Sequence, residues 1–238
     1  DNPRPLHNGD LHDNGCGKLN DFTPEVLNEI KKLNVTCIWY TGVIEHATQT
    51  DYSQCSIKVD HPAIVKGKAG SPYAIKDYYD IDPDLAVDVP NRMKEFENLI
   101  KRTHDAGMKV IIDFVANHVA RQYHSDTPPK GTKDLGADDN PNKAFSPANN
   151  FYYIPNTKFQ GQFDLRDSVG NEYVEYPAKV TGNNRFDAVP TQNDWYETVK
   201  LNYGVDFTNG SVCHFDPIPD TWKKMLDILK FWCKKGVD

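Results

Sequence analysis

The sequence predicts an α/β fold built from parallel β-α units. Three helix-like segments alternate with strand-like segments, which is the element order of such units. One strand-like segment, residues 110–115, reads VIIDFV and is apolar at nearly every position. A strand of this kind is typical of a parallel sheet that is covered on both faces.

The first unit is predicted over residues 23–41. Thr23 followed by Pro24 is typical of a helix N-cap and first helical position. Apolar residues then recur at helical spacing over roughly three turns, at Val26, Leu27, Ile30 and Leu33. The following segment, VTCIWYT at residues 35–41, is β-branched and aromatic and is therefore predicted to be a strand.

Two further helices are predicted. The helix over residues 89–107 ends at Gly107, and its apolar face consists of Met93, Phe96, Leu99, Ile100 and Thr103. The last helix begins at Asp220 as N-cap and ends at Gly236. Its predicted face consists of Trp222, Met225, Leu229, Trp232 and Cys233.

Two connections, residues 42–90 and 116–219, far exceed the usual loop of about 2–6 residues in α/β units. The second is rich in Asn, Asp, Pro and Gly, and it contains the β-like pieces FYYIP and NEYVEYPAKV. We expect it to form a small irregular β-containing subdomain, inserted between a strand and its returning helix.

Composition excludes several functional classes. With 38% hydrophobic and 26% charged residues in 238, the chain has the composition of an ordered globular protein. A net charge of -7 argues against a nucleic-acid partner. No apolar run is long enough for a membrane span. The cysteines lack a C-x-x-C pair, which disfavours a structural zinc site and leaves the redox compartment open: Cys16, Cys37, Cys55, Cys213 and Cys233.

Polar residues lie in and just after the apolar strand. Asn117 and His118 follow it, at the strand end where parallel α/β folds bind ligands. Asp113 lies within it, and a buried carboxylate requires an arginine, a hydrogen-bond donor or a metal as partner.

These residues carry a resemblance. DFVANH, residues 113–118, resembles the D-x-x-x-N-H strand motif of the alpha-amylase family of glycoside hydrolases. Three more segments resemble that family in the same order: LNVTCIWYTGVIEHA, SPYAIKDYYDIDPDLA and HDAGMKVIIDFV. The resemblance spans most of residues 21–123.

The resemblance implies a partial TIM (β/α)8 barrel with a long irregular β-containing insertion after the third barrel strand. Residues 1–118 would hold the second and third strands with the first and second helices. Residues 119–219 would be the inserted B-like subdomain, and residues 220–238 the third barrel helix, before the fourth strand. A whole barrel needs about 250 residues. Either another chain completes the barrel or the segment is self-sufficient, because open sheet edges invite association.

The resemblance also implies retaining cleavage or transfer of α-glucosidic linkages in starch-like glucans or maltodextrins. Such enzymes use a nucleophile and an acid, with carboxyl groups about 5–5.5 Å apart. Both would follow Asp238, so we expect no catalytic residue in this chain and no glucosidase activity from it. Use of polysaccharide favours a secreted or periplasmic location.

Individual roles follow from the same resemblance. His118 would bind hydroxyls of an α-glucan or maltooligosaccharide, and Tyr73 would stack on the sugar ring. Asp113 would pair with an arginine on the next strand, which this chain lacks. Asn117, and Asp206 in the segment LNYGVDF, would be ligands of a calcium ion, a hard cation that accepts oxygen ligands.

Each assignment has an alternative. His118 could be a hydrogen-bonded loop residue, Tyr73 a half-buried aromatic, and Asn117 a cap of its own loop. Trp195 and Tyr196 could line a sugar groove or belong to the core. At the level of function, the alternative is a non-catalytic carbohydrate-binding or transport-associated protein on the same scaffold. A nucleotide-binding fold is disfavoured because no glycine-rich turn follows either strand.

Overall fold

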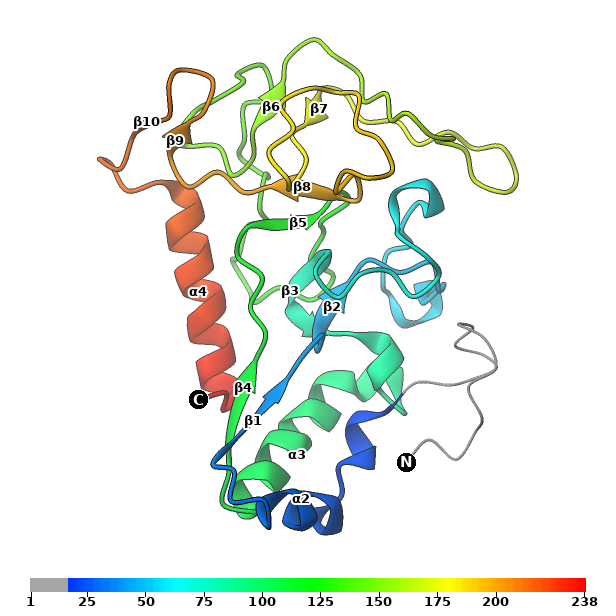
Figure 1. Ribbon diagram of the computed structural model, residues 1–238, viewed down its shortest axis with the longest axis vertical. Helices are drawn as coiled ribbons and strands as arrows, with labels where there is room; N and C mark the ends of the chain where they lie inside the picture. The colour runs from blue at the N-terminus through cyan, green and yellow to red at the C-terminus, as the bar shows by residue number, and fades with distance from the viewer. Residues whose placement is uncertain (1–16) are drawn as a thin grey trace.

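Helices and parallel strands alternate in the first part of the computed structural model, which describes residues 17–238 (Figure 1). The elements that form this alternation are η1 (Leu19–Asp21), α2 (Pro24–Lys31), β1 (Cys37–Tyr40), α3 (Arg92–Asp105) and β4 (Lys109–Ile112), with further elements between β1 and α3. β1 and β4 pair in parallel, with Cys37 opposite Lys109 and Tyr40 opposite Ile112. The chain passes through α3 between them, so the predicted α/β class with parallel pairing is confirmed.

Helix α2 begins as predicted but is shorter. The Thr23 hydroxyl accepts a hydrogen bond from the Val26 backbone N–H at 3.3 Å, which confirms the N-cap. The helix ends at Lys31 because the chain turns at Asn34, whose φ of 61° lies in the left-handed region. Leu33 therefore lies outside the helix and is 75% exposed, so its predicted place on the apolar face of the helix was wrong.

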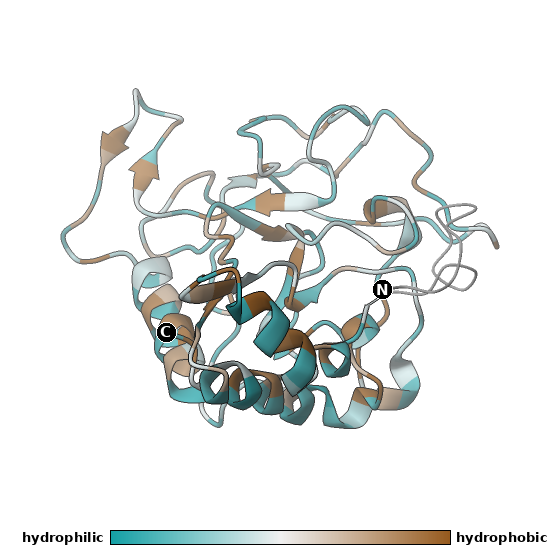
Figure 2. Ribbon diagram, turned by 60° about the horizontal axis from the view of Figure 1, so that its bottom comes forward, coloured by the Kyte–Doolittle hydropathy of each residue, from teal (hydrophilic) through white to brown (hydrophobic). Residues whose placement is uncertain are grey.

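Helix α3 has the predicted buried face. Phe96, Leu99, Ile100 and Thr103 are buried, and Gly107 follows the helix with a φ of +74°. The Thr103 and Tyr40 hydroxyls are 2.8 Å apart, which ties the helix to strand β1. The outer side of α3 is largely hydrophilic (Figure 2).

Helix α4 (Asp220–Lys235) ends at Gly236, as predicted, with a φ of 105°. Two details were wrong. The N-cap is Pro219 rather than Asp220. The buried residues are Thr221, Met225, Ile228 and Trp232, whereas Trp222, Leu229 and Cys233 are exposed. Tertiary packing determines which face of α4 is buried, because the Trp232 indole N–H donates a hydrogen bond to the Tyr78 carbonyl inside the core at 2.9 Å.

One face of the β1–β4 pair has no cover among residues 17–238. Val110 and Tyr40 are buried against the helices, while Trp39 is 62% and Ile111 44% exposed on the other face. The expectation that this strand is buried on both faces was therefore wrong for the described chain. Along the edge of β4 opposite β1, the Asp238 backbone N–H donates to the Val110 carbonyl at 2.9 Å.

Short antiparallel pairs make up the remaining β-structure. They are β2 (Ile44–His46) with β3 (Ile75–Ile81), β5 (His118–Ala120) with β8 (Thr198–Lys200), β6 (Tyr153–Ile154) with β7 (Ala178–Lys179), and β9 (Val205–Asp206) with β10 (Val212–Cys213). Single 3-10 turns occur at η2 (Ser53–Cys55), η3 (Pro62–Ile64), η4 (Pro83–Leu85) and η5 (Val89–Asn91). In Figure 1, strands β5 to β10 lie at the end of the molecule away from α2.

The segment that contains β6 to β10 shares its core with the helices. The main apolar cluster joins buried residues from both parts, including Leu19, Phe96, Val110, Val119, Phe151, Val199 and Trp232. A smaller cluster surrounds Phe159 and Tyr173. The division at residues 118 and 219 therefore stays a prediction about domains, because the packing is continuous across it.

A buried ion pair lies beneath β5. The Arg121 guanidinium donates to Glu175 at 2.7 Å and to the carbonyls of Tyr196, Thr198 and Lys179 at 2.7, 3.1 and 3.2 Å. Burial raises the pKa of Glu175, but the charges of Arg121 and Lys179 outweigh this effect and hold the pKa below its ordinary value. The carboxylate is therefore ionised inside the core.

Two observations bear on the excluded classes. Cys37, Cys55, Cys213 and Cys233 are free thiols, and Cys16 lies outside the described residues. Among residues 17–238, no helix combines the length and apolar character needed to cross a bilayer.

Candidate functional site

His118 and Tyr73 line the same pocket, which has a volume of about 470 Å³. His118 begins strand β5, and Tyr73 lies just before strand β3. The other lining residues are Lys66, Ser71, Trp195, Glu197 and Thr198. The structure therefore brings together the two residues that the sequence suggested for ligand binding, and adds Trp195 to them.

Strand pairing sets the direction of His118. In the β5–β8 register, His118 lies opposite Lys200 and Val119 opposite Val199. Both valines are fully buried, so the alternation along the strand directs His118 away from them. Behind the imidazole, a Cβ on Gly182 would lie 2.9 Å from His118 Cβ and 2.4 Å from Thr198 Oγ1. Only glycine leaves room for the ring at this position.

Asn117 fixes the tautomer of His118. The Asn117 amide group donates to His118 Nδ1 at 2.8 Å and to the Gly182 carbonyl at 3.0 Å. The amide cannot be reversed, because Lys200 Nζ lies 3.4 Å from Asn117 Oδ1 and requires an acceptor there. Nδ1 is thus an acceptor, and the ring proton sits on Nε2.

His118 is neutral at pH 7. Burial, and after it the Lys200 ammonium, lowers the pKa of His118 to about 4, although a hydrogen bond to the Tyr73 backbone acts in the opposite direction. A neutral imidazole with a fixed tautomer has one directed N–H, for which a ligand hydroxyl would compete with the Tyr73 backbone. It is suited to binding a hydroxyl group rather than to carrying a charge.

Aromatic faces border the imidazole. The ring centroids of His118 and Trp195 are 5.1 Å apart, and the Tyr73 and Trp195 side chains are 56% and 45% exposed. Trp195 is therefore a wall of the pocket, whereas Tyr196 packs on Phe163 at 4.4 Å between ring centroids. A ligand with apolar C–H faces and hydroxyl groups matches this combination of surfaces.

Charge in the pocket is balanced. Lys66 Nζ lies 3.2 Å from Glu197 Oε2, and Glu197 is buried. Glu197 is the one carboxylate in the described lining. The lining therefore matches a neutral ligand better than a charged one.

The predicted calcium ligands do not form a cation site in this arrangement. The Asn117 side-chain oxygen faces the Lys200 ammonium at 3.4 Å, and a second cation at that oxygen would be repelled. The Asp206 carboxylate accepts hydrogen bonds from the backbone and hydroxyl of Thr208 at 3.0 and 2.6 Å. These residues fit calcium only if Lys200 moves, so calcium at Asn117 and Asp206 stays a prediction.

Asp113 lies one residue beyond strand β4 and is half-buried. Its backbone N–H donates to the Tyr40 carbonyl at 3.3 Å. No arginine pairs with its side chain among residues 17–238, and the role of Asp113 as partner of an absent arginine stays a prediction.

Sequence reasoning missed Lys66, Ser71, Glu197 and Thr198. Glu197 and Thr198 come from β8 or the residue before it, and they reach the pocket through pairing with β5. Such pairing joins segments about 80 residues apart, so local patterns do not reveal it. Trp195, two residues before Glu197, was the available signal, because the sequence had left it as a candidate for the wall of a sugar groove.

Curated relatives match nearly the whole chain at low identity. The chain is 25% identical to the amino acid transporter heavy chain SLC3A1 of Homo sapiens over 96% of this chain and 26% of that protein. It is 24% identical to maltase A2 of Drosophila melanogaster over 99% of this chain and 32% of that protein. It is also 24% identical to trehalose-6-phosphate hydrolase of Bacillus subtilis over 98% and 32%. The chain thus spans about a quarter to a third of their length.

Solved structures give a similar coverage. An alpha-amylase from Lactobacillus plantarum matches with a TM-score of 0.48 and 23% identity, over 93% of this chain and 32% of that one. A trehalose-6-phosphate hydrolase from Bacillus licheniformis matches with a TM-score of 0.49 and 21% identity, over 94% and 31%.

A family comparison covers almost the entire sequence. Residues 7–238 match the family described as alpha amylase, catalytic domain. Because this match takes in the strands, the helices and the pocket described above, the chain belongs to the alpha-amylase family.

Proposed function

We propose that this chain forms a sugar-binding wall of a retaining glycoside hydrolase or transglycosylase that acts on α-glucosidic linkages of starch-like glucans or maltodextrins. In this role Tyr73 stacks on a glucosyl ring, and His118 binds its hydroxyl groups. The observation that supports the proposal is the shared pocket of Tyr73, His118 and Trp195. Relatives named as a maltase and a trehalose-6-phosphate hydrolase support the same substrate class.

The chemistry of the pocket matches this ligand class. A sugar ring presents hydroxyl groups at its rim and C–H groups on its faces. The exposed Tyr73 and Trp195 rings suit the faces, and the neutral His118 imidazole suits a hydroxyl. An oxocarbenium-like transition state depends on such positioning, because the reacting ring must be held in line with the groups that attack it.

The proposal assigns sugar binding to this chain but not turnover. Retaining hydrolysis needs two carboxyl groups about 5–5.5 Å apart. The described lining offers Glu197 alone, and Glu197 is paired with Lys66 at 3.2 Å. We therefore expect the 238-residue chain to bind maltooligosaccharides without cleaving them. Measurable turnover of starch or a maltoside by the pure chain would contradict this expectation.

The binding test uses maltotriose and isothermal titration calorimetry. Tyr73→Ala and His118→Gln should each weaken binding by roughly tenfold, which corresponds to about 1.4 kcal/mol. Tyr176→Ala is the matched control, because Tyr176 is an exposed tyrosine that does not line the pocket. Wild-type affinity in both pocket variants, with folding verified by circular dichroism, would refute the assignment.

A second candidate is a non-catalytic protein on the same scaffold. It is favoured by relatives in three mammals that are named amino acid transporter heavy chains. The two candidates differ in the full-length protein, where maltooligosaccharide hydrolysis supports the enzyme and its absence supports the second candidate. The pocket variants then test whether sugar binding persists without turnover.

A further inference from the structure

Three buried carboxylates converge between strands β2 and β3. They belong to Glu45, Asp77 and Asp80, and one oxygen of each lies within 4.8 Å of the other two. The strand pairing is irregular here, since Ile44 lies opposite Ile81 but Glu45 lies opposite Asp77. The residues between Asp77 and Ile81 therefore bulge, which lets Asp77 and Asp80 approach Glu45 together.

Glu45 lacks hydrogen-bond donors. The residue is 1% exposed, and neither of its carboxylate oxygens accepts a hydrogen bond from any residue in the described chain. Lys76 Nζ lies 3.9 Å from Glu45 Oε1 but is closer to Asp60 Oδ2, at 3.2 Å. A buried carboxylate without donors is costly, and its oxygens remain free to bind a ligand.

Negative charge exceeds positive charge around this point. Asp80 accepts hydrogen bonds from the Arg92 guanidinium at 2.5 Å and from the Thr127 hydroxyl at 3.0 Å. Asp77 accepts hydrogen bonds from two backbone N–H groups. Arg92 offsets one carboxylate of the three, and Lys76, the second cation here, is shared between Glu45 and a fourth carboxylate, that of Asp60. Burial, and after it the neighbouring Asp77, raises the pKa of Glu45 to about 9. The cluster is short of at least one positive charge.

We propose that Glu45, Asp77 and Asp80 bind a divalent cation of the hard, oxygen-preferring class, with Ca²⁺ as the ion that matches the site. Opposite oxygen ligands of Ca²⁺ stand about 4.6–5.2 Å apart, so three oxygens within 4.8 Å of one another can share one Ca²⁺. Mg²⁺ holds its water ligands more strongly and demands a stricter octahedral arrangement, which favours Ca²⁺ at a site built from three protein carboxylates. The site is separate from Asn117 and Asp206, and it involves no residue of the sugar pocket.

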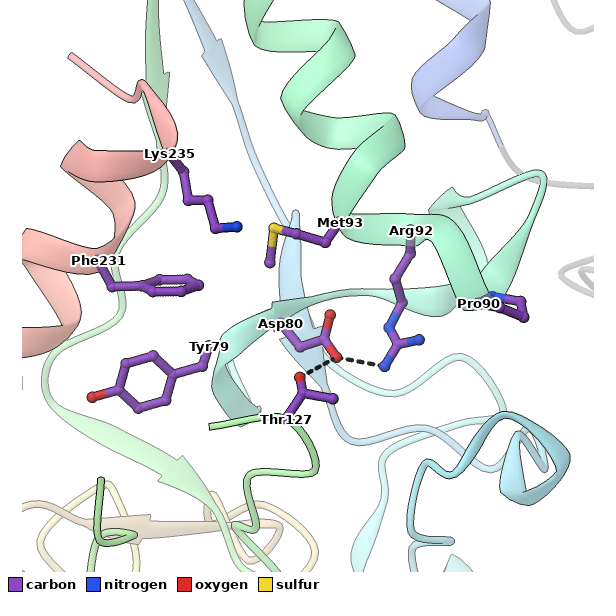
Figure 3. A pocket seen from close by; sticks show the side chains of 8 residues that line it. All are labelled: Tyr79, Asp80, Pro90, Arg92, Met93, Thr127, Phe231 and Lys235. Atoms are coloured by element: carbon purple, nitrogen blue, oxygen red, sulfur yellow. Dashed lines mark hydrogen bonds and ion pairs between the residues drawn. The ribbon is translucent and has the colours of Figure 1, made fainter. Parts of the chain in front are cut away.

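A pocket borders the carboxylate cluster at Asp80. Asp80 lines a pocket of about 270 Å³ together with Tyr79, Thr127, Phe231 and other residues. Figure 3 shows the Asp80 carboxylate at this pocket, bonded to Arg92 and Thr127. Asp80 is the member of the cluster that borders this pocket, so we expect an ion and the water molecules that complete its ligands to approach from this side.

The test starts from EDTA-treated protein that is then dialysed free of chelator. Titration with CaCl₂ by calorimetry should show one site, and added Ca²⁺ should raise the thermal midpoint. Glu45→Gln should weaken Ca²⁺ binding at least tenfold, and so should Glu45→Asp, which keeps the charge but shortens the reach. Asn117→Ala and Asp206→Asn should bind Ca²⁺ like the wild type.

Each result decides the question. Absence of Ca²⁺ binding to the wild type at millimolar concentration would overturn the proposal and leave a shared proton as the stabilising element. Binding that survives in a folded Glu45 variant but is lost in Asn117→Ala or Asp206→Asn would also overturn it. Sensitised Tb³⁺ luminescence that Ca²⁺ displaces is an independent measurement on the wild type, and its absence would count against the site.

Discussion

Arg121→Met should be among the most damaging single substitutions in this protein. The change removes a side chain that is 2% exposed, together with its four hydrogen bonds, and it leaves Glu175 buried without its main counter-ion. Removing one partner of a buried ion pair costs about 3–5 kcal/mol. That is a large share of the roughly 5–15 kcal/mol that separates folded from unfolded domains.

Urea unfolding monitored by tryptophan fluorescence measures this loss. With an m-value of about 2 kcal/mol per M, the midpoint should fall by about 1.5–2.5 M. The double variant Arg121→Met with Glu175→Gln should unfold at a higher urea concentration than Arg121→Met alone, because the unpaired charge is gone. Arg166→Met is the matched control, since Arg166 pairs with Asp164 on the surface and should leave the midpoint unchanged. A midpoint shift in Arg121→Met no larger than in the control would refute the reasoning.

Two further predictions concern His46 and Gly182. Burial lowers the pKa of His46, but the Asp82 carboxylate at 2.7 Å outweighs burial, so the pKa of His46 lies above its ordinary value. The stability that this pair contributes is therefore full below about pH 6.5 and is lost as the pH rises through the folded-state pKa of His46. Thermal midpoints from pH 6 to pH 9 should therefore fall more in the wild type than in His46→Gln, and equal slopes would exclude this role. Gly182→Ala should displace His118 and weaken maltotriose binding, whereas Gly17→Ala should not, because Gly17 has open space around it. Equal affinities of the two variants for maltotriose would contradict the close contact between residue 182 and His118.

Helix termini were predictable because local backbone chemistry sets them. Thr23 caps α2 through its own hydroxyl, and Gly107 and Gly236 end α3 and α4 with left-handed backbone. The buried side of α4 was not predictable in the same way. Trp222 and Trp232 are both aromatic, and only the tertiary partner decides between them, since Trp232 finds the Tyr78 carbonyl inside the core.

The site was predictable in part. Resemblance to a family identified Tyr73 and His118, which the fold then brings to one pocket. Lys200 was missed because it lies opposite His118 through β5–β8 pairing, and this pairing sets its ammonium against the oxygen that was assigned to calcium. The carboxylates around Glu45 were also missed, since a bulge in the strand brings them together and its position depends on the partner strand.

The uncovered side of the β1–β4 pair gives the protein a natural optical reporter. The indole of Trp39 now meets water beside Ile111. Any polypeptide that closed over these two side chains would transfer them to a hydrocarbon environment, and the fluorescence of Trp39 would shift to shorter wavelengths. In a variant that keeps Trp39 as its sole tryptophan, emission colour would thus register closure without an added label.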